Sequence, residues 1–138
     1  MEEYLDLNKS YLNSMHDEIV DTIEIIENNL ILNYESLQRQ HTQSNFVYNK
    51  CNIIFKNIDT PYVEVIKERK CRGKMRLYYI EEFLNIMKRK RYMLQTLYYY
   101  VGYSTVFIDA RLINRKHNTI SKCYFVIPAS EVTYKWMK

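Results

Sequence analysis

Residues 76–101 read RLYYIEEFLNIMKRKRYMLQTLYYYV, and this stretch decides the expected fold of the chain. Its apolar residues recur at the spacing of three and four that lines one face of a helix. One heptad position holds Leu77, Leu84 and Tyr98, and the interleaved position holds Ile80, Met87, Leu94 and Val101. Gly102 follows directly, where a left-handed residue usually ends a helix. The pattern predicts a helix over Arg76–Val101, about 38 Å long at 1.5 Å per residue.

Towards the N-terminus, residues 10–38 carry a similar apolar repeat and predict a long N-terminal helix. Its two interleaved positions hold Leu12, Ile19, Ile26 and Asn33, and His16, Ile23, Leu30 and Leu37. Ile25 and Leu32 fall on the opposite side, so this helix is expected to touch a second helix or subunit there. The pattern leaves one alternative open, in which a helix ends near Asn28 and a strand follows at Leu30–Tyr34.

A first β-hairpin is predicted between the two helices. Its strands, Phe46–Ile58 and Tyr62–Lys67, are rich in Val, Ile, Phe and Tyr, and Asp59-Thr60-Pro61 forms the turn. The segment KERKCRGKMR at residues 67–76 connects this hairpin to the second helix. Because only Glu68 opposes its bases, this basic connection is expected to lie in solvent.

A second β-hairpin is predicted after the second helix. It pairs Tyr103–Asn114 with Thr119–Ile127 across Arg115–Asn118, because apolar and polar residues alternate cleanly in its second strand. Ser130 is then expected to cap a short terminal helix that carries Trp136.

The order α-ββ-α-ββ-(α) predicts a single α+β domain over residues 1–138, with both hairpins in one antiparallel sheet. Residues 1–45 hold two bases and nine acids, whereas residues 46–138 hold eighteen bases and seven acids. The expected organisation is therefore an acidic helical segment at 1–45 and a basic ββαββ core at 46–138. This asymmetry favours a polyanionic partner for the core, unless the acidic segment packs on the core and neutralises it.

Composition excludes several classes of protein. The 138 residues are 47% apolar and 26% charged, which are ordinary globular values and exclude a disordered chain. The N-terminus MEEYLDLNKS lacks the bases and apolar stretch of a signal peptide, and no apolar run approaches a membrane span. An intracellular protein of the cytoplasm or nucleus, without a membrane partner, is expected. Three cysteines without CxxC spacing exclude a fully paired disulfide framework.

The preferred hypothesis is a small non-enzymatic protein that binds nucleic acid, RNA or single strands above all, without a cofactor. Cations replace the counterions of the phosphates, and tyrosine rings stack on the bases. The candidate residues lie in the basic connection and on the outer face of the second helix. They are Lys67, Arg69, Lys70, Arg72, Lys74, Arg76, Tyr78, Lys88, Arg89, Lys90, Tyr92 and Tyr99.

A first alternative is a protein-interaction module. Scarce Gly and Pro beside abundant Tyr, Asn, Ile and Lys are typical of A/T-rich genomes, which suggests a virus or phage accessory factor. The N-terminal helix would then form a homodimer or bind a host protein. The candidate interface residues are Leu12, Ile19, Ile25 and Leu32.

A second alternative is a nuclease. Asp59 followed by Glu68, Arg69 and Lys70 resembles the spaced acid and E-x-K pattern of metal-dependent restriction-type nucleases. The resemblance implies that Asp59 and Glu68 hold Mg²⁺, while Lys70 supports the attacking water.

Overall fold

The computed structural model describes residues 2–5, 15–43, 46–69, 73–102 and 104–138. This part of the chain is mostly β, with thirteen strands and a single α-helix. The strands form two large antiparallel sheets and a small separate hairpin. The predicted α+β fold, with two long helices and one sheet, is therefore wrong.

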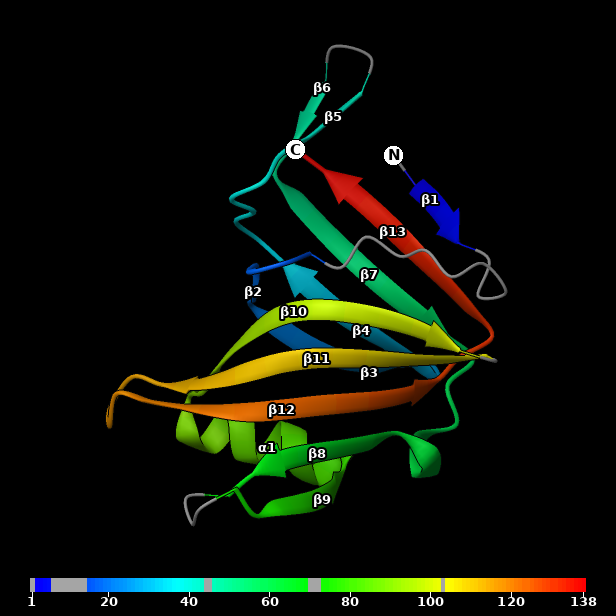
Figure 1. Ribbon diagram of the computed structural model, residues 1–138. Helices are drawn as coiled ribbons and strands as arrows, with labels where there is room; N and C mark the ends of the chain where they lie inside the picture. The colour runs from blue at the N-terminus through cyan, green and yellow to red at the C-terminus, as the bar shows by residue number, and fades with distance from the viewer. Residues whose placement is uncertain (1, 6–14, 44–45, 70–72, 103) are drawn as a thin grey trace.

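The two large sheets lie one in front of the other, with their strands running in different directions (Figure 1). The five-stranded sheet has the order β1 (Glu2–Leu5), β13 (Glu131–Met137), β7 (Lys50–Lys56), β4 (Asn29–Tyr34) and β3 (Thr22–Ile26). The six-stranded sheet has the order β2 (Ile19–Val20), β10 (Met93–Gly102), β11 (Thr105–Asn114), β12 (Thr119–Pro128), β8 (Glu64–Glu68) and β9 (Met75–Tyr79). The small hairpin joins β5 (His41–Gln43) to β6 (Phe46–Tyr48).

The predicted N-terminal helix is replaced by β2, β3 and β4, and its first residues, 10–14, lie outside the described residues. The sequence Thr-Ile-Glu-Ile-Ile of β3 alternates between exposed and half-buried positions, as a strand does. Glu27 and Asn28 have φ values of 49° and 63°, and Ile26 pairs with Asn29. Positive φ at both positions is typical of the two-residue turn that closes a β-hairpin. The alternative strand at Leu30–Tyr34 is confirmed by β4.

The stretch 76–101 also differs from its prediction. Only its centre is helical, as α1 (Ile80–Lys90), while its two tyrosine-rich ends belong to β9 and β10. Arg91 ends the helix in the left-handed conformation with φ 53°, and Tyr92 N–H donates to the Met87 carbonyl at 3.3 Å. Arg91 therefore terminates the helix because its backbone turns out of the helical region, and the chain reverses into β10.

The second predicted hairpin is confirmed, because β11 and β12 pair throughout and Asn114 lies opposite Thr119. The first hairpin is wrong, since β7 and β8 belong to different sheets and η1 (Thr60–Tyr62) leads from one to the other. The predicted terminal helix is also wrong. Residues 131–137 form β13, whose side chains alternate with the backbone pleat and bury Trp136.

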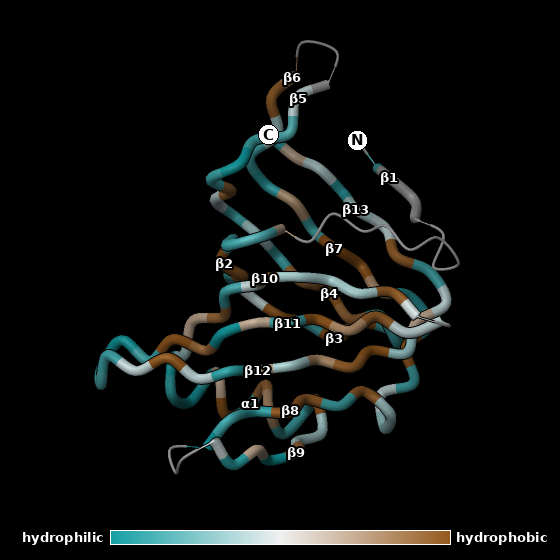
Figure 2. The backbone as a smooth tube through the Cα atoms, viewed as in Figure 1, coloured by the Kyte–Doolittle hydropathy of each residue, from teal (hydrophilic) through white to brown (hydrophobic). Residues whose placement is uncertain are grey.

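The core lies between the facing sheets, and α1 extends the layer of the five-stranded sheet. Apolar residues follow the central strands of both sheets, while hydrophilic residues gather at the tip of the β11–β12 hairpin (Figure 2). Ile80 and Phe83 of α1 are fully buried, and the ring of Phe83 meets that of Phe125 edge-on at 5.4 Å. The helix therefore packs on the inner face of the six-stranded sheet, and its two flanks lie beside β3 and beside β8–β9.

Candidate nucleic-acid interface

A basic hollow lies between α1 and the strands β8 and β9, with a volume of about 530 Å³. Its lining combines six cations with two tyrosines and one apolar residue. These residues are Lys67, Arg69, Lys74, Arg76, Arg89, Lys90, Tyr78, Tyr92 and Ile86. None of the lining residues is acidic. The structure therefore brings six of the predicted cations together from three separate segments of the chain.

The pairing of β8 with β9 explains how the strand residues reach this hollow. Lys67 lies directly opposite Arg76 in the register, and it also lies opposite the buried Cys123 of β12. Because one side of a strand faces the core, Lys67 and Arg76 both project on the side where α1 packs. Like charges directly opposite each other destabilise a sheet, so this pair costs stability in the absence of an anion.

Two features moderate the charge of the basic hollow. The guanidinium of Arg76 lies 3.5 Å from the carboxylate of Glu82, but both side chains are about half exposed, at 51% and 48%. Such an exposed pair contributes little stability. The last turn of α1 also carries the negative end of the helix dipole, which favours Lys88, Arg89 and Lys90. Neither feature neutralises six cations.

The tyrosines of the hollow are less open than its cations. Burial leaves Tyr78 only 8% exposed, and the Arg76 guanidinium covers its ring at 4.6 Å from the centroid. Tyr92 is half-buried, with the Lys67 ammonium 5.7 Å from its ring centroid. Tyr92 therefore retains a partly open ring, whereas Tyr78 supports Arg76 and is too buried to stack on a base.

The predicted stacking role of Tyr99 is wrong, because this residue lies in the core. Its hydroxyl is 2.6 Å from that of Tyr34, which is 3.0 Å from the hydroxyl of Thr96. Burial raises the pKa of both Tyr34 and Tyr99 well above the ordinary value, since an ionised phenol would lose its hydration there. These tyrosines join the two sheets by hydrogen bonds instead of facing a ligand.

A second hollow of about 530 Å³ continues the basic surface towards the tip of the β11–β12 hairpin. It shares Lys67, Arg69 and Tyr92 with the basic hollow, and Glu68 adds one acid to its lining. His117 and Asn114 line its far side. The hairpin tip adds the exposed Arg115 and Lys116. The hairpin turn was predicted from the sequence, but only the pairing of β12 with β8 places it beside the basic hollow.

The described acidic residues near the N-terminus do not line the basic hollow. Among residues 15–43 the exposed acids are Asp17, Asp21, Glu24, Glu27 and Glu35, and none of them is a lining residue. Glu18 is buried instead, where its carboxylate accepts the backbone N–H groups of Gln38 and Arg39 at 3.0 and 2.9 Å. The described acids therefore leave the hollow open to solvent.

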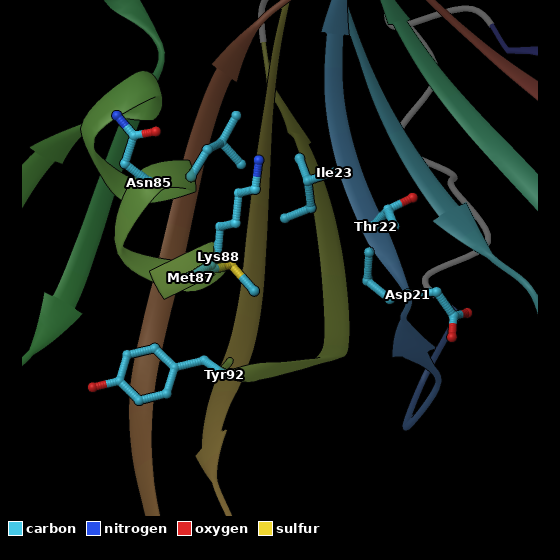
Figure 3. Close-up of a pocket in the computed structure, with 9 residues that line it drawn as sticks. Asp21, Thr22, Ile23, Asn85, Met87, Lys88 and Tyr92 are labelled. Atoms are coloured by element: carbon cyan, nitrogen blue, oxygen red, sulfur yellow. The ribbon is translucent and has the colours of Figure 1, made fainter. Parts of the chain in front are cut away.

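The opposite flank of α1 borders a different space, the strand–helix groove of about 400 Å³ between α1 and β3. Val20, Ile23, Leu84, Met87 and Tyr92 supply most of its lining, and Lys88 projects from α1 towards Ile23 (Figure 3). Lys88 was predicted with the nucleic-acid residues, but the structure places it on this side. Lys70 and Arg72, also predicted, lie outside the described residues.

Comparison with protein-family models, with curated proteins and with solved structures finds no match to this chain. In the described part of the chain, no helix has both the length and the apolar composition that crossing a bilayer requires.

The residues of the nuclease pattern are not brought together. Asp59 precedes η1, which leads into the start of β8, whereas Glu68 ends β8. The five residues of this strand span about 13 Å, so carboxylates at its two ends are too far apart to share one ion. Lys70 lies outside the described residues.

The predicted helical interface does not form either. Leu32 is a core residue of β4 with 1% exposure, and Ile19 pairs with Gln95 of β10. Ile25 is half-buried on β3, while Leu12 lies outside the described residues. The candidates for contact with a partner are scattered because the segment folds as strands, which point alternate residues to opposite faces.

Proposed function

We propose that this chain binds nucleic acid without catalysing a reaction, and that its partner is a single strand, RNA above all. The observation that carries the proposal is the basic hollow, where six cations from β8, β9 and α1 line one concavity without an acid among its lining residues. Phosphates would release the counterions that such a cluster attracts.

The shape of the basic hollow favours a flexible strand over a duplex. A concave site between a helix and two strands accepts a chain that can bend into it, whereas a duplex presents a stiff convex backbone. The second hollow extends the path towards the hairpin tip, and Tyr92 lies where the two meet. Tyr92 is the ring that would stack on a base along this path.

The opposed cations Lys67 and Arg76 also support a bound anion. Their register places two like charges opposite each other in a sheet, an arrangement that costs about 0.2–1 kcal/mol. A phosphate between them would turn that repulsion into two attractive contacts. The same reasoning applies to Arg69 and Lys74, which are held together by the hydrogen bond from Arg69 N–H to the Lys74 carbonyl at 2.7 Å.

The test is fluorescence anisotropy with labelled oligouridine, oligothymidine and a duplex of the same length, over a range of salt concentrations. Six phosphate contacts predict a slope of log affinity against log salt of about −4 for a single strand. Affinity that does not change with salt, or equal binding of the duplex, contradicts the proposal.

A matched pair of charge reversals locates the site. Arg89→Glu changes a lining residue of the basic hollow, and Lys135→Glu changes an exposed residue of β13 by the same charge. We expect Arg89→Glu to weaken binding and flatten the salt slope, while Lys135→Glu stays close to the unmodified protein. Equal losses in both variants would show that only the overall charge matters.

A further inference from the structure

The outer edge of β3 is open in the described structure, because β3 is the last strand of its sheet. The two-residue turn makes Ile26 and Asn29 the hydrogen-bonded pair that closes the hairpin. Hydrogen-bonded pairs alternate along an antiparallel ladder, so Glu24 and Thr22 also direct their backbone groups towards β4. The N–H and carbonyl groups of Ile23 and Ile25 therefore point to the open edge.

The strand–helix groove runs beside this edge. Ile23 forms one wall and the α1 residues Leu84 and Met87 form the other, so a strand placed next to β3 would bury its inward side chains between them. Adjacent strands lie about 4.8 Å apart, which puts an added backbone in the groove between β3 and α1. The groove thus offers backbone pairing on one side and apolar contacts on the other.

Two charged residues line the strand–helix groove, Lys88 and Asp21. The Lys88 side chain is exposed and extends from α1 towards Ile23, while Asp21 turns away from the helix (Figure 3), and its carboxylate accepts the backbone N–H of Glu35. An incoming chain therefore meets an ammonium group above an apolar floor. This charge is complementary to a carboxylate on the ligand.

We propose that the strand–helix groove binds an extended peptide, which pairs with β3 as an additional strand and places a carboxylate beside Lys88. Apolar side chains of the peptide fill the space between Ile23, Leu84 and Met87. Backbone pairing gives such a site its affinity, and the groove selects the alternate side chains. Because β3 continues on both sides of Ile23, the paired peptide runs past Lys88, and the carboxylate belongs to an acidic side chain of the peptide.

This site is separate from the basic hollow. The two lie on opposite flanks of α1 and share only Tyr92 and the helix itself. In the described lining of the groove Lys88 is the one cation and Asp21 is an acid, so the groove cannot act as a track for phosphates, whereas the unpaired strand edge suits a polypeptide backbone. A peptide can therefore bind in the groove whether or not the basic hollow binds nucleic acid.

The first experiment uses three pools of short synthetic peptides that alternate apolar and variable positions. One pool carries an internal acidic residue with blocked ends, one carries a free C-terminal carboxylate without an acid, and one carries lysine with blocked ends. We expect the pool with the internal acidic residue to bind and the other two pools not to bind. Binding of no pool, of all three equally, or of the free C-terminal pool in preference overturns the proposal.

Amide hydrogen exchange by NMR tests the mode of binding. In the unbound protein the amides of Ile23 and Ile25 are expected to exchange fast, while that of Glu24 is protected by β4. A bound peptide should slow exchange at Ile23 and Ile25. Binding without this protection overturns strand addition. Protection that appears without peptide and rises with protein concentration identifies a second copy of the chain as the occupant, and also overturns the proposal.

Two adjacent helix residues provide a matched control. Lys88→Glu should lower affinity for the carboxylate peptides by about fivefold, the effect of losing an exposed ion pair of about 1 kcal/mol. Arg89→Glu, one residue further along, should leave peptide binding unchanged because Arg89 faces the basic hollow. If Lys88→Glu binds these peptides as tightly as the unmodified protein, the assigned role of Lys88 is overturned. If Arg89→Glu loses nucleic-acid binding but keeps peptide binding, that loss concerns only the basic hollow.

Discussion

The two flanks of α1 differ in almost every property that decides what a surface binds. Towards β8 and β9 the helix contributes Arg89 and Lys90 to a hollow with six cations. Towards β3 it contributes Leu84 and Met87 to a groove whose only cation is Lys88 among the described lining residues. Successive residues of a helix are rotated by about 100°, so one basic turn supplies two chemically different sites.

This difference shows that local charge does not define a site. Lys88, Arg89 and Lys90 are equivalent in the sequence and all exposed, yet they face different neighbours. The neighbours are β3, which is far away in the chain, on one flank, and β8 with β9, which directly precedes the helix, on the other. The position of α1 between those strands is therefore the structural feature on which both sites depend.

The largest expected effect comes from detaching the helix. Phe83 is fully buried against Phe125, and Phe83→Ala should lower the free energy of unfolding by about 3–5 kcal/mol. Chemical denaturation measures the loss. At temperatures where the variant stays folded, both nucleic-acid and peptide binding should weaken. A variant that keeps one activity at full strength would show that only one flank depends on the docking of α1.

A second effect is expected at high pH, where the buried tyrosines of the core make the free energy of unfolding depend on pH. Tyr34 and Tyr99 have pKa values raised by burial, so the unfolded chain loses their protons first, from about pH 10. Their stabilising contribution is complete below that pH and is lost as pH rises towards the folded pKa values, by about 1.4 kcal/mol per pH unit for each group.

In the variant Tyr99→Phe the free energy of unfolding should therefore fall less steeply with pH above 10, because unfolding releases about one proton fewer. At neutral pH the same variant should lose about 1 kcal/mol of stability with the hydrogen bond to Tyr34. Urea unfolding at several pH values measures the slope. The control is Tyr100→Phe, since Tyr100 is 55% exposed and should leave the slope unchanged. Unchanged nucleic-acid binding in Tyr99→Phe is expected. A clear loss of nucleic-acid binding would show that Tyr99 contributes to the interface.

The smallest effect concerns the like-charge pair of the basic hollow. Lys67→Met keeps the apolar stem and removes the repulsion with Arg76, so the free energy of unfolding should rise by about 0.2–1 kcal/mol. Binding of single strands should weaken in the same variant, and the salt slope should become shallower by about 0.7. A fall in both stability and binding would indicate that Lys67 supports the fold. A gain in both would show that Lys67 does not bind the nucleic acid.

Patterns in the sequence differed in how well they predicted the structure. The β11–β12 hairpin was predicted because alternation with a period of two is unambiguous over a long strand, and Cys123, Phe125 and Ile127 are indeed buried. Residues 76–101 were misassigned because apolar residues spaced by three and four also fit two strands joined by a short helix. The tyrosines of β9 and β10, which favour strands, were the signal that the helical repeat concealed.

The candidate site was predicted in part for a related reason. The cations of residues 67–76 and 88–90 were named from charge density, which the sequence states directly. Tyr78 and Tyr99 were assigned to a ligand-binding face because a helical projection was applied to residues that lie in strands. His117 and the β11–β12 tip were missed, since nothing near them in the sequence indicates that β8 is their neighbour.

By itself the sequence determined the division of charge, the positions of the cations and the hairpin at residues 105–128, whereas the strand at residues 30–34 was only the alternative to a predicted helix. The tertiary structure decided which of those cations meet, because β8 pairs with both β9 and β12 while α1 packs across the inner face of their sheet. It also decided that β3 is an edge strand beside a helix. Pairing between distant strands depends on register and burial across the whole core, and no local run of residues contains that information.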